Sequence, residues 1–398
     1  MTSGPFSCFS RGSILPELPE KLGTVTRVAH VITGLGTGGA ELMLARLLPS
    51  LQRRGFESMV VSLTTGGEVA ERILALGVRV ACVDLKPPRS LRGLADLVDE
   101  LRRFRPDLVQ TWMYHADLLG GLVAAAALRV PAVWNLRTTD PRCLPGHRRL
   151  LKACALLSGI IPARIVACSH AAVRAHADFG YSVRTATVIH NGFDVERLYS
   201  DLDGGRRVRA ELGITDTSRV IGLVARFDPL KDHRTFLEAA GELAQRDADV
   251  RFILCGEGVT WENQQLGDWI ARAQLEGRCF LLGRRSDIRE VNSALDIATC
   301  SSTMEGMPNV VGEAMACGVP CVVTNVGDAA LLVGNTGEVV TPASATALAA
   351  AWQNMLSRGP AELQRRGQRA RARIVDEFSL EAAAARYSDL YQSVLRAA

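Results

Sequence analysis

The chain has 398 residues, 47% of them hydrophobic, which is too long for one ordinary core and too apolar for a disordered protein. Its net charge of +4 and pI of about 8.6 are too mildly basic to indicate a dedicated nucleic-acid binder. We therefore expect two folded domains of ordinary size.

Residues 1–26 carry scattered Gly, Pro and Ser and no apolar run behind basic residues, which predicts a loose N-terminal tail and no secretory signal. No later stretch is apolar enough to span a membrane. The ten cysteines form no CxxC pair and have no His partner at metal-ligand spacing. We expect them to be small buried side chains of a cytoplasmic protein, one that is soluble or peripheral on the inner face of the cytoplasmic membrane.

From Arg27 to about residue 190, short apolar runs alternate with stretches of helical period. The runs read as strands: "RVAHVIT", "SMVVSL", "VRVACVDL", "PDLVQTW", "AVWNL", "RIVAC" and "ATVIH". Strand and helix in strict alternation are typical of a parallel sheet that is covered on both faces.

The first glycine-rich loop is "GLGTGGAE", residues 34–41, between a predicted strand and a predicted helix. It fits G-x-G-x-x-G, and the amides at a helix N-terminus favour phosphate. A dinucleotide site also needs a carboxylate at the end of the next strand, where this chain has Ser62, Leu63 and Thr64. A nicotinamide oxidoreductase is therefore disfavoured, and a tight turn that serves only packing stays an alternative.

The polar stretch "HNGFDVERLYSDLDGG" reads as a linker to a second unit with the same alternation. Its strands are expected at "VIGLVARF", "VRFILCG", "CFLLG", "DIATC" and "PCVVT", and a last helix at about 379–397 is expected to cap either domain. The fold class is thus α/β, with two doubly wound domains. Ligands of such sheets lie beyond the carboxyl ends of the strands, so a cleft between the domains is the expected site.

Polar residues follow several strands of the second unit. Arg226 and Lys231 flank the turn after its first strand and suit a diphosphate, although paired surface cations are often only solvated. Glycines follow further strands in "CGEG" and "LLGRRSDI". In "EGMPNVVGE" a helix from about Asn309 offers amides to a phosphate or a sugar, and Glu313 can accept hydrogen bonds from a ribose. Glu305 can face another part of the same ligand; the alternative is that both glutamates are solvated.

In this order, "VARFDPLKD", "CGEG", "LLGRRSDI", "EGMPNVVGEAMACGVPCVVT" and "GEVV" resemble the donor domain of retaining glycosyltransferases of family 4, also called glycosyl transferases group 1. The resemblance covers most of the chain from Arg27 onward. It implies the GT-B fold, in which two Rossmann-like domains face each other across a cleft. Residues 27–195 would form the acceptor domain, 196–377 the nucleotide-sugar donor domain, and 378–398 a helix that crosses back.

The resemblance also implies roles for individual residues. Arg226 and Lys231 would bind the diphosphate and stabilise it as leaving group, Glu305 would lie beside the donor sugar, and His115 would point at that sugar. His115 on its own would read as an ordinary loop histidine. The donor would contact Gly38, Gly39, Gly256, Gly283, Arg284, Gly306, Met307, Pro308, Asn309, Val310 and Glu313.

Neither Asp-x-Asp sequence, 201–203 or 247–249, lies at the carboxyl end of a predicted strand. We therefore expect transfer without a metal or other cofactor, with fixed cations supplying the charge stabilisation. Arg137 and Asp140, after the strand "AVWNL", are the candidate acceptor residues.

Residues 141–177 hold six basic residues and no acidic one, together with the apolar "ACALLSGIIPA". Such a segment can contact an anionic membrane or a lipid diphosphate acceptor. A solvated helix face beside a buried one is the alternative.

The function expected from these features is transfer of a sugar, with retention, from a UDP or GDP sugar to a glycan or lipid-linked acceptor in cell-surface polysaccharide or lipopolysaccharide synthesis. Two alternatives share the fold. A nucleotide-sugar epimerase would need further acid/base carboxylates in the cleft, and a non-catalytic nucleotide-sugar-binding protein would not need the combined set of cations and glutamates.

Overall fold

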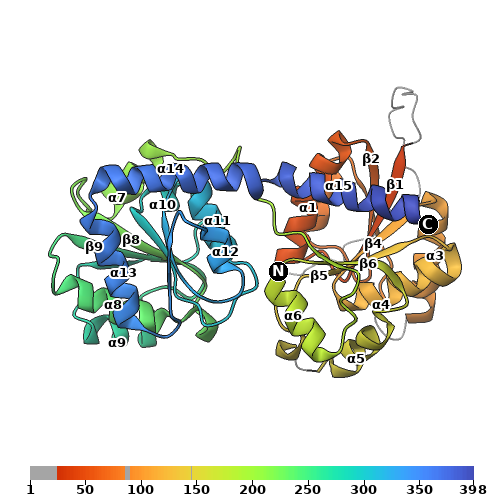
Figure 1. Cartoon of the computed structure of the whole chain (residues 1–398), viewed down its shortest axis with the longest axis horizontal. Coiled ribbons are helices and arrows are strands. Elements are labelled where there is room, and N and C mark those ends of the chain that lie inside the picture. Colours follow the sequence, from red (N-terminus) through yellow and green to blue (C-terminus); the bar gives the residue numbers. More distant parts are fainter. Residues whose placement is uncertain (1–24, 86–89, 145) are drawn as a thin grey trace, which may run out of the picture.

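The computed structural model describes residues 25–85, 90–144 and 146–398. The predicted tail therefore lies almost wholly outside the described residues. In the described part, a seven-stranded sheet of order β3-β2-β1-β4-β5-β6-β7 is followed by a six-stranded sheet of order β10-β9-β8-β11-β12-β13, as two lobes joined by a long helical arm (Figure 1). Every strand pair is parallel. The expected pair of doubly wound α/β domains is confirmed.

The first sheet is covered by helices on both faces, because alternate residues of its strands are buried on opposite sides. Val28 and Ile32 pack with α1 and with the last helix, α15 (Leu380–Ala397), whereas Ala29 and Val31 pack with α3 and α4. The strands are β1 (Thr26–Ile32), β2 (Phe56–Ser62), β3 (Arg79–Cys82), β4 (Leu108–Trp112), β5 (Ala132–Leu136), β6 (Pro162–Ala167) and β7 (Ala186–Val188). The helices are α1 (Gly39–Arg53), α2 (Glu68–Ala75), α3 (Ser90–Phe104), α4 (Tyr114–Leu122), η1 (Val123–Leu128), η2 (Pro141–Cys143), α5 (Arg148–Leu157) and α6 (His170–Phe179).

The second sheet is built in the same way, with Ile221 and Ile253 of neighbouring strands in different cores. Its strands are β8 (Arg219–Val224), β9 (Val250–Cys255), β10 (Cys279–Leu281), β11 (Ile297–Cys300), β12 (Cys321–Thr324) and β13 (Glu338–Val340). The helices are α7 (Leu202–Glu211), η3 (Pro229–Lys231), α8 (His233–Ala244), α9 (Gln264–Arg272), α10 (Ile288–Ser293), α11 (Asn309–Ala316), α12 (Ala329–Val333), α13 (Ala345–Ser357) and α14 (Pro360–Glu377).

The end of the expected linker is a helix, which corrects the sequence reading. Asp201 caps α7 by accepting a hydrogen bond from the Gly204 amide at 2.9 Å. Gly205 is buried in that helix, and a Cβ at this position would lie 2.4 Å from the carbonyl oxygen of Ser293. The two glycines that suggested a flexible linker instead allow α7 to pack closely on α10.

The chain passes between the lobes at two places that are hydrogen-bonded to each other. The Phe193 amide donates to Phe378 O at 2.8 Å, and the Leu380 amide donates to Phe193 O at 2.9 Å. Beyond this junction α15 lies along the first domain (Figure 1), where Asn135 donates to the hydroxyl of Tyr387 at 3.0 Å. The last helix thus adds its apolar face to the core of the first domain.

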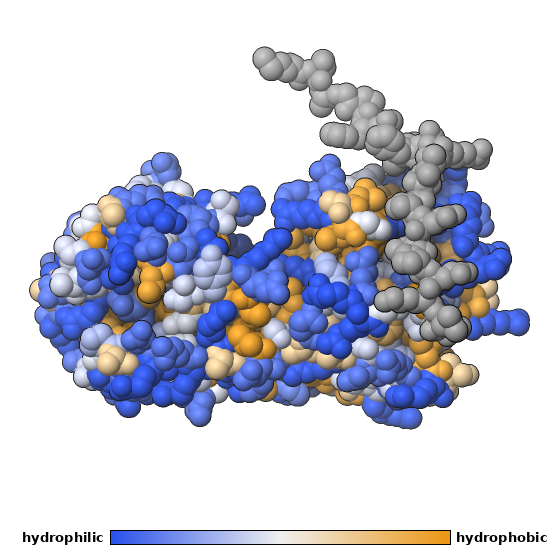
Figure 2. Space-filling model, turned by 90° about the horizontal axis from the view of Figure 1, so that it is seen from above, coloured by the Kyte–Doolittle hydropathy of each residue, from blue (hydrophilic) through white to orange (hydrophobic). Residues whose placement is uncertain are grey.

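The face seen from above is mostly hydrophilic, and it is hollowed between the lobes (Figure 2). Among the described helices, none is both long and apolar enough to cross a membrane. Seven of the cysteines whose side chains the structure describes are buried, as small core side chains would be.

Candidate active site

Lys231 and Glu305 meet at the carboxyl edge of the second sheet. Lys231 ends the short turn η3 after β8, and Glu305 follows β11, the strand that pairs with β8. Lys231 Nζ lies 2.5 Å from Glu305 Oε1, which also accepts a hydrogen bond from Ser302 Oγ at 2.7 Å. The two side chains are only 21% and 11% exposed. A mostly covered ion pair at a strand end is a preorganised group of charges rather than a solvated surface contact.

Arg226 lies beside the same turn but is held by its own loop. Its Nη2 donates to Asp228 Oδ2 at 2.9 Å, and its side chain is 61% exposed. Burial opposes ionisation of Asp228, but hydrogen bonds from the Leu230 amide and from Arg226 hold the pKa of this carboxyl below its usual range. Asp228 thus stays charged and orients the guanidinium of Arg226, which remains accessible to a ligand phosphate.

Glycines let the strand-end loops of the second sheet pack on one another. The Gly256 amide donates to Gly283 O at 2.8 Å, and a Cβ on Gly256 would lie 2.1 Å from the carbonyl oxygen of Ala225. Gly283 has a φ of +61°, which favours glycine. Arg284 next to it is exposed. The loops after β8, β9 and β10 therefore form one compact edge.

The loop 306–310 leads into α11 against the first domain. A Cβ on Gly306 would lie 2.8 Å from Thr139 Oγ1, so glycine permits the two domains to approach here. In the same loop Met307 is buried, whereas Asn309 and Val310 are half-buried. Pro308, in extended conformation, precedes the first turn of α11 and directs the helix N-terminus.

Glu313 lies in a cavity between the domains, of about 100 Å³, lined by Gly39, Leu42, Met43, Arg46, Asn191, Gly192, Phe193, Asn309 and Glu313. Burial raises the pKa of Glu313, and the positive charge of Arg46 opposes that shift. Gly312 allows α11 to lie close to Phe193, another residue that lines the cavity, because a Cβ on residue 312 would lie 2.0 Å from the Phe193 ring. Glu313 is half-buried by accessibility, and a carboxylate that faces a cavity is able to accept hydrogen bonds from ligand hydroxyls.

The first domain contributes the glycine loop and the N-terminus of α1. Gly38 is the N-cap residue of α1 and makes no side-chain cap. Gly39 has open space around its Cβ position and lines the cavity of Glu313. The first glycine loop, at the N-terminus of α1, therefore lies beside Glu313 of the second domain. Gly38 is part of that loop but does not line the cavity.

His115 is the second residue of α4, directly after β4. The residue before this helix, Met113, has a φ of +73° and ψ of 160°, a conformation that is strained for a side chain with a Cβ. The ring of His115 makes an edge contact with His147, with centroids 5.3 Å apart. Burial, and next the charge of His147, lower the pKa of His115, so the imidazole is neutral at pH 7.

Both halves of the chain match models of one group of enzymes. Glycosyltransferase Family 4 matches residues 37–197, and Glycosyl transferases group 1 matches residues 218–358. The chain belongs to the family 4 glycosyltransferases. It is an enzyme of the transferase class, and the predicted family and GT-B fold are confirmed.

Among its relatives, this glycosyltransferase is 26% identical to the Bacillus anthracis N-acetyl-alpha-D-glucosaminyl L-malate synthase, over 67% of this chain and 69% of the relative. It is 26% identical to an Escherichia coli UDP-Gal:alpha-D-GlcNAc-diphosphoundecaprenol alpha-1,3-galactosyltransferase, over 67% and 70%. The crystal structure of Anabaena HepE in complex with UDP superposes with a TM-score of 0.81 at 23% identity, over 92% of this chain and 100% of HepE.

The candidate acceptor residues of the glycosyltransferase are both engaged in contacts. Arg137 donates to Asn191 Oδ1, and its guanidinium lies 5.6 Å from the centroid of the Trp112 ring. Asp140 caps η2 and accepts from Arg142 at 2.8 Å. Arg142 holds the pKa of Asp140 below its usual range, against a smaller effect of burial. Arg137 thus lies at the domain junction, whereas Asp140 orders its own loop.

The structure adds residues that the sequence did not indicate. Arg46 lies more than a turn inside α1, Asn191 donates to Asn309 Oδ1 at 2.6 Å, and Asp328 accepts from His190 at 3.0 Å. None of them belongs to a glycine-rich motif. The sequence did hold one indication for Asn191 and Asp328, which is their position after a strand, because both strands end at the edge that faces the cleft.

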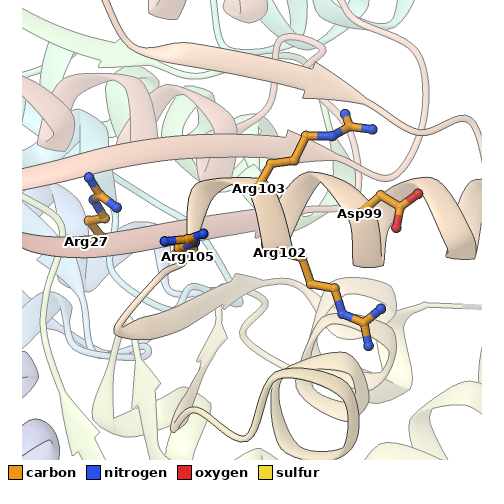
Figure 3. A pocket seen from close by; sticks show the side chains of 5 residues that line it. All are labelled: Arg27, Asp99, Arg102, Arg103 and Arg105. Carbon is orange, nitrogen blue, oxygen red and sulfur yellow. The ribbon is translucent and has the colours of Figure 1, made fainter.

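A second cavity of the glycosyltransferase, about 690 Å³, is lined by Arg27, Asp99, Arg102, Arg103 and Arg105 (Figure 3). It lies where β1 begins and α3 ends. In a parallel sheet all strands begin at one edge and end at the other, so this cavity is at the edge of the first sheet opposite to the carboxyl ends of its strands, which the glycine loop and His115 follow. We therefore do not assign the donor to it.

Proposed function

We propose that the enzyme moves a sugar, with retention of anomeric configuration, from a UDP or GDP sugar to a glycan or lipid-linked acceptor in cell-surface polysaccharide synthesis. The observation that carries the proposal is the covered Lys231–Glu305 pair at the carboxyl edge of the second sheet, beside the N-terminus of α11. The E. coli relative, whose name includes a diphosphoundecaprenol acceptor, supports the acceptor class.

In this proposal the donor diphosphate lies between Arg226 and Lys231. Negative charge grows on the diphosphate as the glycosidic bond breaks, and the two cations stabilise it without rearranging. The amides at the start of α11 add a positive dipole end. Glu305, held by Lys231 and Ser302, faces the sugar, and Glu313 accepts hydrogen bonds from the ribose.

The nucleotide is identified by ligand-induced stabilisation. Purified protein is heated with UDP, GDP, ADP or NAD, and the nucleotide that binds the native state raises Tm. Release of nucleoside diphosphate from its sugar is then followed with and without acceptor glycans. Transfer requires the acceptor. A change in the donor sugar without any acceptor would instead favour the epimerase, and stabilisation by NAD alone would contradict the proposal.

Glu313→Gln is expected to weaken binding of that nucleotide about tenfold to a hundredfold, because a hydrogen bond to a charged group contributes about 1.5–3 kcal/mol. Isothermal titration with the nucleoside diphosphate measures the change. The exposed Glu276→Gln is the matched control and should bind normally. Unchanged affinity in Glu313→Gln would remove this residue from ribose recognition.

Transfer is expected to continue when divalent metal is removed, since fixed cations lie where the diphosphate would leave. The measurement is the initial rate after dialysis against EDTA, compared with the rate after Mg²⁺ or Mn²⁺ is added back. Equal rates support the proposal. Loss of activity that either metal restores would show that a metal ion stabilises the leaving group.

Helix α5 is the surface by which the enzyme would contact an anionic membrane. Arg148, Lys152 and Leu156 lie four residues apart on α5 and are exposed, and Ile160 is exposed in the turn that follows, with Leu156 at 78% and Ile160 at 79%. Basic residues beside exposed large apolar ones suit a surface with anionic headgroups over acyl chains. This position would give the enzyme access to a lipid-linked acceptor.

The double variant Leu156→Ser, Ile160→Ser is expected to lose most binding to vesicles that contain phosphatidylglycerol, as measured by co-sedimentation. Arg206→Ala, an exposed change on α7 of the other domain, is the control. Binding to purely neutral vesicles should be weak for all proteins, because the basic residues need anionic headgroups. Equal binding of the double variant and the wild type would show that α5 does not contact the membrane.

A further inference from the structure

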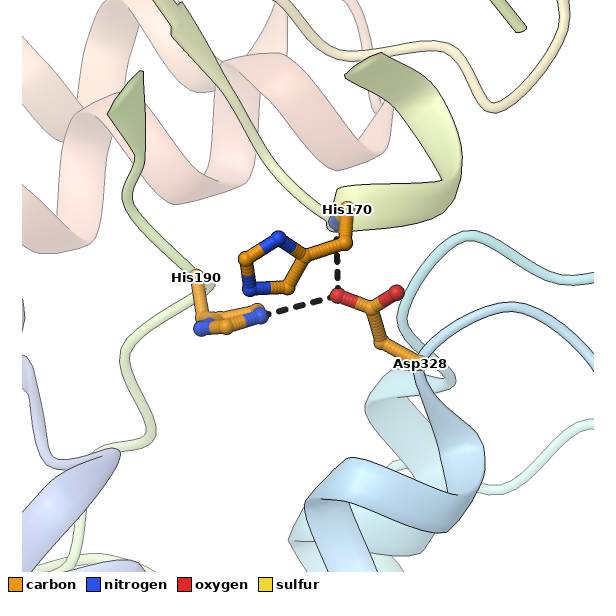
Figure 4. A group of neighbouring side chains, drawn as sticks. All are labelled: His170, His190 and Asp328. Atoms are coloured by element: carbon orange, nitrogen blue, oxygen red, sulfur yellow. Dashed lines mark hydrogen bonds and ion pairs between the residues drawn. The ribbon is translucent and has the colours of Figure 1, made fainter. Parts of the chain in front are cut away.

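Asp328, at the start of α12 in the second domain, reaches into the first domain (Figure 4). Its Oδ2 accepts a hydrogen bond from the His170 amide at 2.7 Å, and its Oδ1 accepts one from the Ala171 amide at 3.1 Å. These are the first two residues of α6. A carboxylate from one domain thus satisfies two amides at a helix N-terminus of the other, where the helix dipole favours negative charge.

The same carboxylate contacts the segment that joins the domains. His190 Nε2 lies 3.0 Å from Asp328 Oδ2. The His190 ring also makes edge contacts with His170 and with Phe378, at centroid distances of 5.8 and 5.5 Å. Phe378 immediately precedes the point at which the chain returns to the first domain. Asp328 therefore contacts the first domain through α6, and the segment that joins the domains through His190.

His170, His190 and Asp328 each offer one atom of the kind that binds metals, all within 4.8 Å. The backbone around the carboxylate argues for another role, because two amides at a positive helix end already donate to its oxygens. Burial opposes ionisation, yet the bonds from His190 and the two amides hold the pKa of Asp328 below its usual range. The carboxylate is charged and its oxygens are already bonded.

The backbone of this residue binds the donor loop. The Asp328 amide donates to Gly306 O at 2.8 Å. The preceding Gly327 has a φ of +56°, and a Cβ on it would lie 2.2 Å from Glu305 O. The 327–328 turn is therefore packed directly on the loop that carries Glu305.

We propose that Asp328 is a positioning residue that couples closure of the two domains to the geometry of the Glu305–Gly306 loop, an inference that rests on the proposed transfer at this loop. When α6 and His190 bind the carboxylate, the turn is fixed and its amide holds Gly306 in place. When the domains separate, the carboxylate loses those partners and the loop loses its support. Closure thus completes the donor site.

The first test compares Asp328→Ala with wild type by small-angle X-ray scattering, with and without UDP or GDP. The variant is expected to have a larger radius of gyration, a kcat at least tenfold lower, and an affinity for the nucleoside diphosphate within threefold of wild type. Asp201→Asn changes an aspartate that caps a helix within one domain, and should leave scattering and kcat unchanged.

His190 gives a second, milder comparison. His190→Phe keeps a ring at this position and loses the hydrogen bond to Asp328, so it should open the molecule partly; His190→Gln keeps a donor and should stay near wild type. Identical scattering in Asp328→Ala and wild type, with kcat within twofold, would overturn the proposal. The scattering measures domain closure whether or not any sugar donor is turned over. Failure of the proposed transfer can therefore be distinguished from failure of the proposed role of Asp328.

Discussion

Lys231→Ala is expected to lower kcat about a hundredfold to a thousandfold, the loss typical when one preorganised charge is removed from a transition state. Lys231 lies 2.5 Å from Glu305 and is only 21% exposed. Its removal also leaves the largely covered carboxylate of Glu305 without its cation. The measurement is the steady-state rate of nucleoside diphosphate release with acceptor present.

Arg234→Ala is the matched control, because Arg234 also carries a positive charge, three residues later, but is exposed and pairs with Glu238 on its own helix. It should keep normal kcat. Both variants should melt within a few degrees of wild type, which excludes global unfolding as the cause. A Lys231→Ala enzyme with full kcat would place the stabilising charge elsewhere.

The meeting of Lys231 and Glu305 was predictable only in part. Each residue could be placed after a strand from the sequence, since apolar runs and turn residues mark where the strands end. Their contact depends on strand order, however, because β11 pairs with β8 although β9 and β10 lie between them in the chain. The spacing of apolar residues along the chain does not specify the order of the strands in the sheet. The rules for connections in parallel sheets only reduce the number of possible strand orders.

The contacts between domains were not predictable from local pattern. Arg46 and Asp328 are single polar residues whose role depends on how two separately folded units are oriented. Phe193 reads as one aromatic residue in a polar stretch, and only the structure shows its ring against Gly312. The hydrophobic pattern of each domain is the same however the two domains are oriented. The pattern therefore does not predict which residues lie at the interface.

Helix α14 shows that a closely packed helix can lack the hydrophobic pattern by which helices are predicted from sequence. Its buried residues are Leu363, Gly367, Ala370 and Ile374, a stripe in which two members are too small to signal a hydrophobic face. Gly367 is required because a Cβ there would lie 1.8 Å from Gly318 O. This helix is therefore hard to predict from hydrophobicity alone, although the spacing of these positions is helical.

Asp117 is a carboxyl of α4 whose complete burial favours its neutral form. Burial raises its pKa to about 8, against hydrogen bonds with Thr111 and the Asn135 amide. Thr111 Oγ1 lies 2.5 Å from Asp117 Oδ1 and 3.2 Å from Val133 O. The hydroxyl of Thr111 has one proton and cannot donate to both oxygens, whereas a protonated Asp117 can donate to the hydroxyl, which then donates to the Val133 carbonyl, so both contacts become hydrogen bonds.

Asp117→Asn is therefore expected to become more stable than wild type as pH rises. An unfolded aspartate loses its proton near pH 3.8, whereas the folded one keeps it to about pH 8. Between these values the native state binds more protons, so this group makes the free energy of unfolding fall by about 1.4 kcal/mol per pH unit. The amide does not ionise, and the variant lacks this slope.

Urea denaturation of both proteins at pH 5, 6, 7 and 8 measures the effect. The free energy of unfolding of Asp117→Asn, relative to wild type, should rise by about 3–4 kcal/mol between pH 5 and pH 8 if the slope persists. The exposed Asp178→Asn should show no such trend. A constant difference across this range would mean that Asp117 is ionised in the folded enzyme. In that case its Oδ2, which has no hydrogen-bond partner among the described residues, would share a buried and unpaired negative charge.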